Sequence, residues 1–165
     1  MNYALINIAL RTMLSNPAPL PAFLVGLAQT GPGSIEDLSW TAPNFDNEYV
    51  GKGYWVVQDI YPTPAAWQQN SSTPTYAVDA AQPLVTATYE LETRPVDAVR
   101  TEKIAALANY RLNKAQLVVQ QPVGMDLQVF INQCFAVEAQ HKSAINALTT
   151  SEAISNYDFT TGWPS

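Results

Sequence analysis

The stretch PVDAVRTEKIAALANYRLNKAQL, residues 95–117, decides the fold class of this chain of 165 residues. It is rich in good helix formers, and proline fits the first turn of a helix, where its missing N–H group is not needed. Ten of the twelve prolines occur at or before Pro95, and prolines at that density exclude long helices. The chain is therefore predicted to change from an extended region, residues 1–94, to a helical region, residues 95–165.

The helical region is predicted to form a hairpin of two helices. From Asp126 to about Leu148, apolar residues recur at the i, i+3, i+4, i+7 spacing of a helix with one buried face. Asp126 suits the positive end of the dipole of this helix. Thr149 and Glu152 have the spacing of a capping box, which predicts a short last helix that ends near Asn156.

The sequence of the extended region, residues 1–94, predicts β-strands. GYWVVQDIY (53–61) and LVTATYELET (84–93) are rich in β-branched and aromatic residues, and the second alternates between apolar and polar positions. The turn-rich segment 61–74 predicts a long hairpin arm between them, and TYAVD (75–79) a shorter strand. NYALINIAL (2–10) fits a strand or a short helix, and we favour the strand because so short a helix is marginal. The fold class is therefore α+β: a small antiparallel sheet with a Pro-rich extended arm, followed by a helical hairpin and a short terminal helix.

Composition limits the kind of protein. Charged residues make up 13% of the chain, against about a quarter in typical domains, which favours a surface partly covered by partners, although neutral polar residues are plentiful too. The net charge of −6 argues against binding to nucleic acid. No basic residue precedes the first apolar stretch, and no apolar run approaches the ~20 residues of a membrane span. We expect a protein that is made and kept in the cytoplasm, or that leaves it only as part of a larger assembly.

The first predicted helix places apolar and basic residues on the same face, whereas a helix packed only on its own core separates them. Either the basic side chains pack their stems along the edge of an apolar strip, or the face meets an acidic surface of a partner or of the chain's own N-terminal half. The candidate partner-binding residues of this helix are Arg100, Lys103, Leu107, Tyr110, Arg111 and Lys114.

Residues that could carry chemistry are few. His141 is the single histidine and lies seven residues from Cys134, the single cysteine, which is ~10.5 Å along a helix and too far to share a metal ion. We interpret Cys134 as a core residue and His141 as an edge residue of the apolar stripe. The motifs G-x-S-x-G, G-x-G-x-x-G and the P-loop are absent from the sequence. We expect no enzyme, no cofactor and no metal site.

Two weaker hypotheses involve acids and aromatic rings. The acid pairs Glu36–Asp37 and Asp46–Glu48 lie near aromatic residues, as in a glycosidase, but adjacent acids in a turn-rich region are more often a solvated loop. The rings could instead bind a glycan or line contacts of the arm. The candidate aromatic contacts are Trp40, Trp55, Tyr61 and Trp67.

Three stretches together resemble a family of small proteins encoded beside the tail-fibre genes of tailed bacteriophages. LVGLAQTGPGSIEDLSWTAPN (24–44) resembles their Leu-Ser-Trp-Thr segment, and residues 51–95 resemble their strand–Pro-turn–strand arm. VDAVRTEKIAALANYRL (96–112) and LTTSEAISNYDFTTGWPS (148–165) resemble the helical domain of unknown function that ends them. The family has no catalytic residues to carry over.

The resemblance implies a structural part of the virion at the tail tip, baseplate or fibre attachment. Its partners would be other tail or tail-fibre proteins, with the chain present in repeated copies or as a homo-oligomer and bound to neither nucleic acid nor membrane. An assembly chaperone for the tail fibre that leaves before the virion is complete is the alternative, and a glycan-binding module at the host surface is a third possibility.

Trp163, near the end of the chain, completes the candidate partner-binding residues. By analogy with the related proteins, Thr160 or Thr161 together with Gly162 would turn the chain after the last helix and lay Phe159 and Trp163 on the helix pair. Docking on a neighbouring subunit is the alternative.

Overall fold

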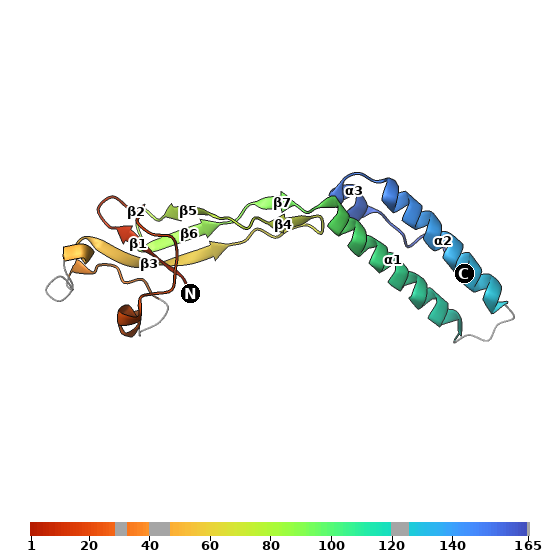
Figure 1. Ribbon diagram of the computed structural model, residues 1–165, viewed down its shortest axis with the longest axis horizontal. Helices are drawn as coiled ribbons and strands as arrows, with labels where there is room; N and C mark the ends of the chain where they lie inside the picture. Colours follow the sequence, from red (N-terminus) through yellow and green to blue (C-terminus); the bar gives the residue numbers. More distant parts are fainter. Residues whose placement is uncertain (29–32, 40–46, 120–125, 165) are drawn as a thin grey trace. The chain divides into compact units, whose positions relative to one another are not determined.

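The computed structural model describes residues 1–28, 33–39, 47–119 and 126–164. Strands and short 3₁₀ helices occupy the first half of the chain and three α-helices the second, so the fold is α+β as predicted (Figure 1). Two compact units are present. Unit 1 comprises Met1–Thr63 and Asn70–Glu90, and unit 2 comprises Pro64–Gln69 and Leu91–Ser165. The segments 64–69 and 91–94, which the sequence placed in the extended region, thus group with the helices.

Unit 1 is built on a five-stranded sheet in the order β2-β1-β3-β6-β5. Its strands are β1 Tyr3–Asn7, β2 Thr12–Met13, β3 Lys52–Ile60, β5 Thr75–Val78 and β6 Leu84–Thr88. All neighbours are antiparallel except β3 and β6, which run parallel. The expected strands near the N-terminus, at 53–61 and at 75–79 are confirmed. The parallel pair arises because the chain reverses twice between β3 and β6.

The expected strand 84–93 is wrong as one element, because it divides into β6 and β7 (Leu91–Thr93), which pairs with β4 (Gln68–Asn70). In the β5–β6 ladder Thr75 faces Thr88, whereas the N–H of Ser71 bonds the carbonyl of Glu90 at 2.7 Å. The four steps from Ser71 to Thr75 therefore lie opposite only two steps, from Thr88 to Glu90, so one side has two extra residues. The surplus includes Pro74, which has no N–H to donate to a ladder, and the two ladders are separate for that reason.

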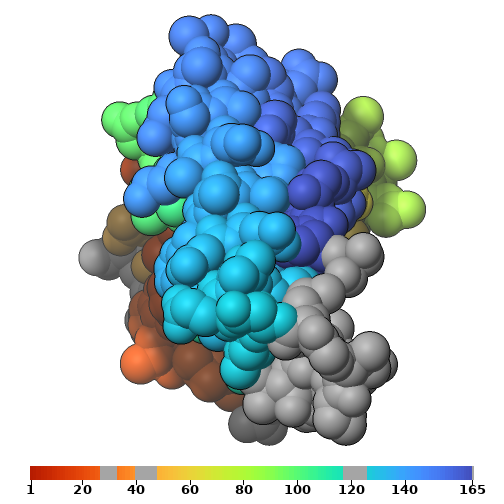
Figure 2. Space-filling model, turned by 90° about the vertical axis from the view of Figure 1, so that its right-hand side faces the viewer, coloured from red at the N-terminus to blue at the C-terminus, as the bar shows by residue number. Residues whose placement is uncertain are grey.

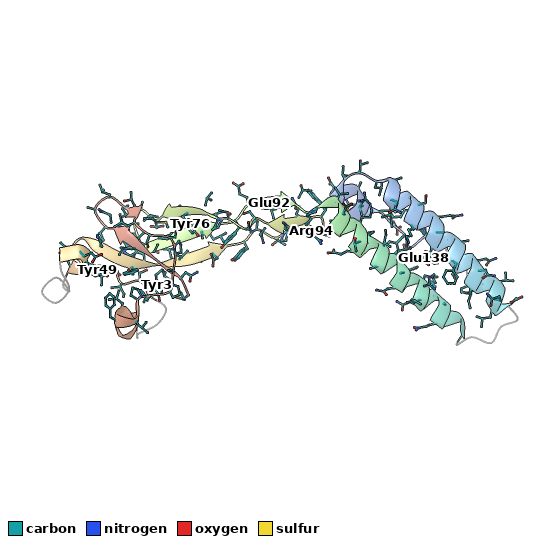
Figure 3. All side chains as sticks on the ribbon, in the orientation of Figure 1. Tyr3, Tyr49, Tyr76, Glu92, Arg94 and Glu138 are labelled. Atoms are coloured by element: carbon teal, nitrogen blue, oxygen red, sulfur yellow. The ribbon has the colours of Figure 1, made fainter. Side chains whose placement is uncertain are left out.

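The core of unit 1 lies on one face of this sheet. Its buried residues are Ala4, Ile6, Trp55 and Val85. The Arg11 guanidinium lies 4.9 Å from the Trp55 ring centroid and donates to the carbonyl of Asp79 at 2.8 Å. Tyr3 is buried on the opposite face, toward the 3₁₀ helix η1 (Ala22–Ala28), as Figure 3 shows. A second short helix, η3 (Asn47–Tyr49), precedes β3.

Unit 2 contains α1 (Val96–Val119), α2 (Leu127–Ala147) and α3 (Ser151–Asn156), with α1 and α2 side by side (Figure 1). Its buried core residues are Val99, Leu107, Ile145 and Ile154. The Asp126 side chain caps α2 by accepting from the N–H groups of residues 128 and 129, which confirms its predicted place. None of the helices in the described ranges is long and apolar enough to cross a membrane.

The predicted capping box of α3 is wrong by one residue. Thr150, not Thr149, is the N-cap, and its Oγ1 accepts from the N–H of Ala153 at 3.2 Å. The buried Ser151 donates from Oγ to the carbonyl of Arg94 at 2.6 Å. This tertiary bond fixes Ser151 as the first helical residue, so the cap falls on the residue before it.

Gly53 allows a close approach of backbone in unit 1. A Cβ at this position would lie 2.4 Å from the carbonyl oxygen of Glu36 and 2.8 Å from that of Ile35. We expect Gly53→Ala to lower the free energy of unfolding by about 1–3 kcal/mol, since backbone atoms would have to move. Gly33→Ala is the control, because nothing lies within 4 Å of a Cβ there. Equal denaturant midpoints for the two variants would contradict the packing described.

Candidate interaction surfaces

The basic residues at the start of α1 are bound within unit 2. Arg100 forms an ion pair with Asp97 and donates from Nη2 to the carbonyl of Leu148 at 3.0 Å. Lys103 donates from Nζ to the carbonyl of Ser155 at 2.7 Å, and the Nζ lies 5.1 Å from the Phe159 ring centroid. Burial lowers the pKa of the Lys103 amine. Both cations therefore close the ends of neighbouring helices, where carbonyl groups lack helical partners.

The next basic residues of α1 face α2. Arg111 pairs with Glu138 at 2.6 Å, both side chains are about four-fifths buried, and Glu138 projects toward α1 (Figure 3). The Arg111 guanidinium also lies 4.4 Å from the Phe135 ring centroid. Leu107 is fully buried, and Lys114 is half-buried. These contacts favour the interpretation that the basic stems follow the apolar strip, and the assignment of the candidate residues to a partner stays a prediction.

Trp163 docks on its own chain, as expected. Its ring packs on the helical core, 5.3 Å from the Tyr110 ring and 5.9 Å from the His141 ring between centroids. Its Nε1 donates to the carbonyl of Phe159 at 2.6 Å. Gly162, at φ +79°, makes the turn that brings the ring back. Figure 2 shows this terminal segment, in dark blue, against α2.

His141 holds the same segment, a role that sequence reasoning missed. Its Nε2 lies 3.0 Å from the carbonyl oxygen of Thr161 and its Nδ1 2.8 Å from the Tyr157 hydroxyl. A carbonyl only accepts, so Nε2 carries the proton, and in the neutral ring Nδ1 accepts from the hydroxyl. Helical periodicity does not reveal this role, because it does not show that His141 meets the terminal segment.

The terminal turn also depends on Asp158. Its carboxylate accepts from the Thr160 hydroxyl at 2.7 Å and from the Thr160 N–H at 2.8 Å. These bonds lower the pKa of the Asp158 carboxyl. The side chain thus forms a local turn at the point where the chain leaves α3.

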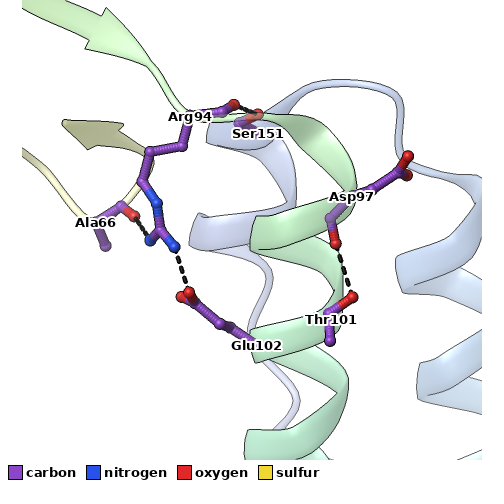
Figure 4. A network of polar contacts seen from close by, with 6 residues as sticks. All are labelled: Ala66, Arg94, Asp97, Thr101, Glu102 and Ser151. Carbon is purple, nitrogen blue, oxygen red and sulfur yellow. Dashed lines mark hydrogen bonds and ion pairs between the residues drawn. The ribbon is translucent and has the colours of Figure 1, made fainter. Parts of the chain in front are cut away.

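Arg94 joins the strands of unit 2 to its helices (Figure 4). Its guanidinium donates to the carbonyl of Ala66 at 2.8 Å and pairs with Glu102 of α1, which lowers the pKa of the Glu102 carboxyl. Its own carbonyl accepts from Ser151 of α3. These groups border an open pocket of about 300 Å³. The residues that line it are Ala66, Arg94, Val99, Glu102, Lys103, Ala106 and Ser155. Its charged side chains already have partners, so it is a structural junction.

The described aromatic candidates do not form one surface. Trp55 is only 2% exposed and belongs to the core of unit 1. Tyr61 is exposed and stacks on Tyr89 with 4.3 Å between centroids. Trp67 is half-buried in unit 2, and Trp40 lies outside the described residues. A sugar cannot stack on a ring as deeply buried as Trp55, so the glycan hypothesis loses that residue.

The acid pairs do not form a reactive site in the described residues. Asp37 accepts from the Ser39 hydroxyl at 2.6 Å and from its N–H at 2.8 Å, which lowers the pKa of the Asp37 carboxyl. Glu36 and Glu48 are exposed, and Asp46 lies outside the described part. Cys134 is buried, and burial raises the pKa of its thiol. No group of three metal-ligating side chains occurs in the ranges that the structure describes.

Exposed apolar side chains form the surface that sequence reasoning missed. Unit 1 exposes Phe23, Val25 and Val50, and unit 2 exposes Leu112, Leu127, Val129 and Phe135. In the sequence those of unit 2 are hard to distinguish from core residues, because apolar residues occur on more than one face of each long helix. Large apolar groups held in water are typical of binding surfaces.

The docked tryptophan gives a stability prediction. Trp163→Ala should lower the free energy of unfolding of the helices by about 1–3 kcal/mol, because the ring is partly buried against two other rings. Trp163→Phe keeps most of the packing and loses the Nε1 donor, so its effect should be smaller. Denaturation followed by helical circular dichroism measures both. An unchanged midpoint for Trp163→Ala would mean that the ring contributes nothing within the chain.

The contacts of Arg94 give a second stability prediction. Ser151→Ala removes the buried hydroxyl that donates to the carbonyl of Arg94 and should cost about 1–2 kcal/mol of unfolding free energy. Ser143→Ala is the matched control, because Ser143 is exposed on α2. The same denaturation experiment compares the two, and equal stability would show that the junction does not depend on this bond.

The polar side chains of unit 2 that could carry chemistry are thus engaged in contacts within that unit, and several large apolar side chains are exposed. Comparison of the chain with protein-family models, with curated proteins and with solved structures gave no match.

Proposed function

We propose that this chain is a non-enzymatic structural component of a bacteriophage virion, an adaptor at the tail tip, baseplate or tail-fibre attachment. The observation that carries the proposal is the division into two units, each with its own core and its own exposed large apolar side chains. An adaptor needs two binding surfaces on one chain, and apolar groups are what such surfaces bury.

The use of the polar residues supports a structural role. His141 and Asp158 hold the terminal segment, Arg94 joins strands to helices, and Cys134 is buried with a raised pKa. A nucleophile or a general base needs access to substrate as well as a tuned pKa. These residues are instead engaged in contacts that fix the fold.

The resemblance of residues 24–44, 51–95, 96–112 and 148–165 to proteins encoded beside tail-fibre genes supplies the virion context. The charged content of 13% agrees with a protein whose surface is partly covered in an assembly. Partners would be other tail or tail-fibre proteins, and the chain would occur in repeated copies, as tail parts are symmetric.

A tail-fibre assembly chaperone is the second candidate. Exposed apolar residues such as Phe23, Leu112 and Phe135 also suit a protein that covers apolar fibre surfaces while the fibre folds. The two candidates differ in where the chain is found after assembly, because a chaperone leaves and an adaptor stays.

Quantitative mass spectrometry of purified particles of the phage that encodes the chain tests the proposal. We expect a fixed copy number relative to the major tail protein, at a small multiple of three or six. Absence from mature particles, with the chain bound to fibre protein in infected cells, would replace the adaptor by the chaperone. Absence from both would refute a role in the tail.

A further inference from the structure

Two tyrosines lie opposite each other where the parallel strand pair of unit 1 ends. The ladder between β3 and β6 ends with Ile60 opposite Thr88. The next pair is Tyr61 and Tyr89, and the N–H of Tyr89 donates to the carbonyl of Ile60 at 3.1 Å. Opposite residues of neighbouring strands place their side chains on the same face of a sheet. The distance between strands, ~4.8 Å, therefore sets the distance between the two rings.

The two rings are stacked and open to solvent. Their centroids lie 4.3 Å apart, and the ring planes are inclined by 20°. Tyr61 is 56% exposed and Tyr89 is half-buried, so a reagent in solution reaches the pair through Tyr61. Pro62 follows Tyr61, and proline favours an extended conformation in the residue before it. The backbone thus keeps the Tyr61 ring opposite its neighbour although β3 has ended.

A carboxylate lies beside the stacked pair. Asp59 is two residues before Tyr61 and so lies on the same face of the sheet, and its Oδ1 accepts from the Tyr89 hydroxyl at 3.2 Å. A hydrogen bond with Tyr61 raises the pKa of Tyr89, and burial and the charge of Asp59 act in the same direction. The phenol therefore keeps its proton in neutral solution, and it loses an electron readily only when a base takes that proton. The Asp59 carboxylate is within reach to do so.

We propose that Tyr61 and Tyr89 are a site of oxidative modification, at which the two rings are joined as dityrosine. The proposal does not rest on the proposed function. A one-electron oxidant removes an electron from each ring, and each phenol releases its hydroxyl proton, that of Tyr89 to Asp59. The two phenoxyl radicals form a carbon–carbon bond between their Cε atoms, which are ortho to the oxygens. The protons on these carbons are transferred through solvent to the phenol oxygens, which restores both aromatic rings. The protein thus loses two hydrogen atoms, and hydrogen peroxide takes them up as it is reduced to two molecules of water.

The stacked geometry suits the formation of this bond. A phenoxyl radical carries unpaired electron density on both faces of its ring at the ortho carbons, so two such rings couple when they meet face to face. Groups that the fold already holds together react as if they were at very high concentration. Among the ring contacts of the described residues, the contact between Tyr61 and Tyr89 is the one that joins two tyrosines. Coupling within the chain is therefore expected at this pair.

The bond would fix the end of the parallel pair. Between Tyr61 and Tyr89 the chain leaves β3, passes through β4 and β5, and returns along β6. A cross-link closes this segment covalently, and closing a loop lowers the conformational entropy of the unfolded chain. The cross-linked chain should therefore unfold at a higher temperature than the same chain before oxidation.

The test is oxidation of the full chain, at micromolar concentration, by a haem peroxidase with hydrogen peroxide. We expect dityrosine fluorescence from a chain that still migrates as a monomer on a denaturing gel, and a cross-linked peptide that contains Tyr61 and Tyr89. Tyr61→Phe keeps the stacked ring but lacks the phenol, and should lower the yield at least about tenfold, because the route that proximity favours is lost. Tyr76→Phe is the matched control, because Tyr76 is 42% exposed on β5, outside the stacked pair. Circular dichroism shows whether each variant is folded.

Each outcome decides a part of the proposal. Absence of dityrosine in the wild type, an equal yield from Tyr61→Phe, or a product that joins separate chains and increases with protein concentration would overturn the site. Asp59→Asn keeps a hydrogen-bond acceptor but not a base, so it should slow the cross-linking severalfold, and an equal rate would overturn the role of Asp59. An unchanged melting temperature after cross-linking would overturn the effect on the strand pair. Virion mass spectrometry does not decide these results, so the failure of either proposal is recognised separately.

Discussion

The polar contacts of Arg94 determine how unit 2 is assembled. The guanidinium binds the carbonyl of Ala66 and the carboxylate of Glu102, and the Arg94 carbonyl accepts from Ser151. The partners lie up to 57 residues away in sequence, so one residue joins the strand pair, α1 and α3. The start of α3 follows from this junction, and the docking of the terminal segment on the helix pair follows from α3.

Two antiparallel helices cannot bury all their apolar residues against each other. The terminal segment, with Phe159 and Trp163, covers one side of the pair, and His141 fastens it there. The side with Leu112 and Phe135 has no such cover in the described chain. The helix pair is therefore covered by its own chain on one side, and large apolar side chains stay exposed on the other.

The sequence predicted those features that depend on local chemistry. Proline density, helical periodicity and the acidic cap at Asp126 placed the change of structure and both long helices. The return of Trp163 at Gly162 was expected from the resemblance to the related proteins, and the structure has it. The sequence did not predict features that depend on distant partners. The expected strand 84–93 divides because the partner side of the ladder has two extra residues, at a site that includes Pro74. α3 starts at Ser151, whose hydroxyl donates to the carbonyl of Arg94.

The same distinction explains the candidate site. Basic residues on an apolar face indicate either a partner or an acceptor within the chain. Helical periodicity does not distinguish the two, because it does not show which carbonyl groups at the ends of other helices lie nearby. Arg11, Arg94, Arg100, Lys103 and Arg111, five of the eight basic residues, are held by contacts within the chain. Their charges contribute to the fold, because each meets a carbonyl, a carboxylate or an aromatic ring of the same chain. The mixed basic and apolar face of α1 is therefore accounted for by the ends of the neighbouring helices and by Glu138.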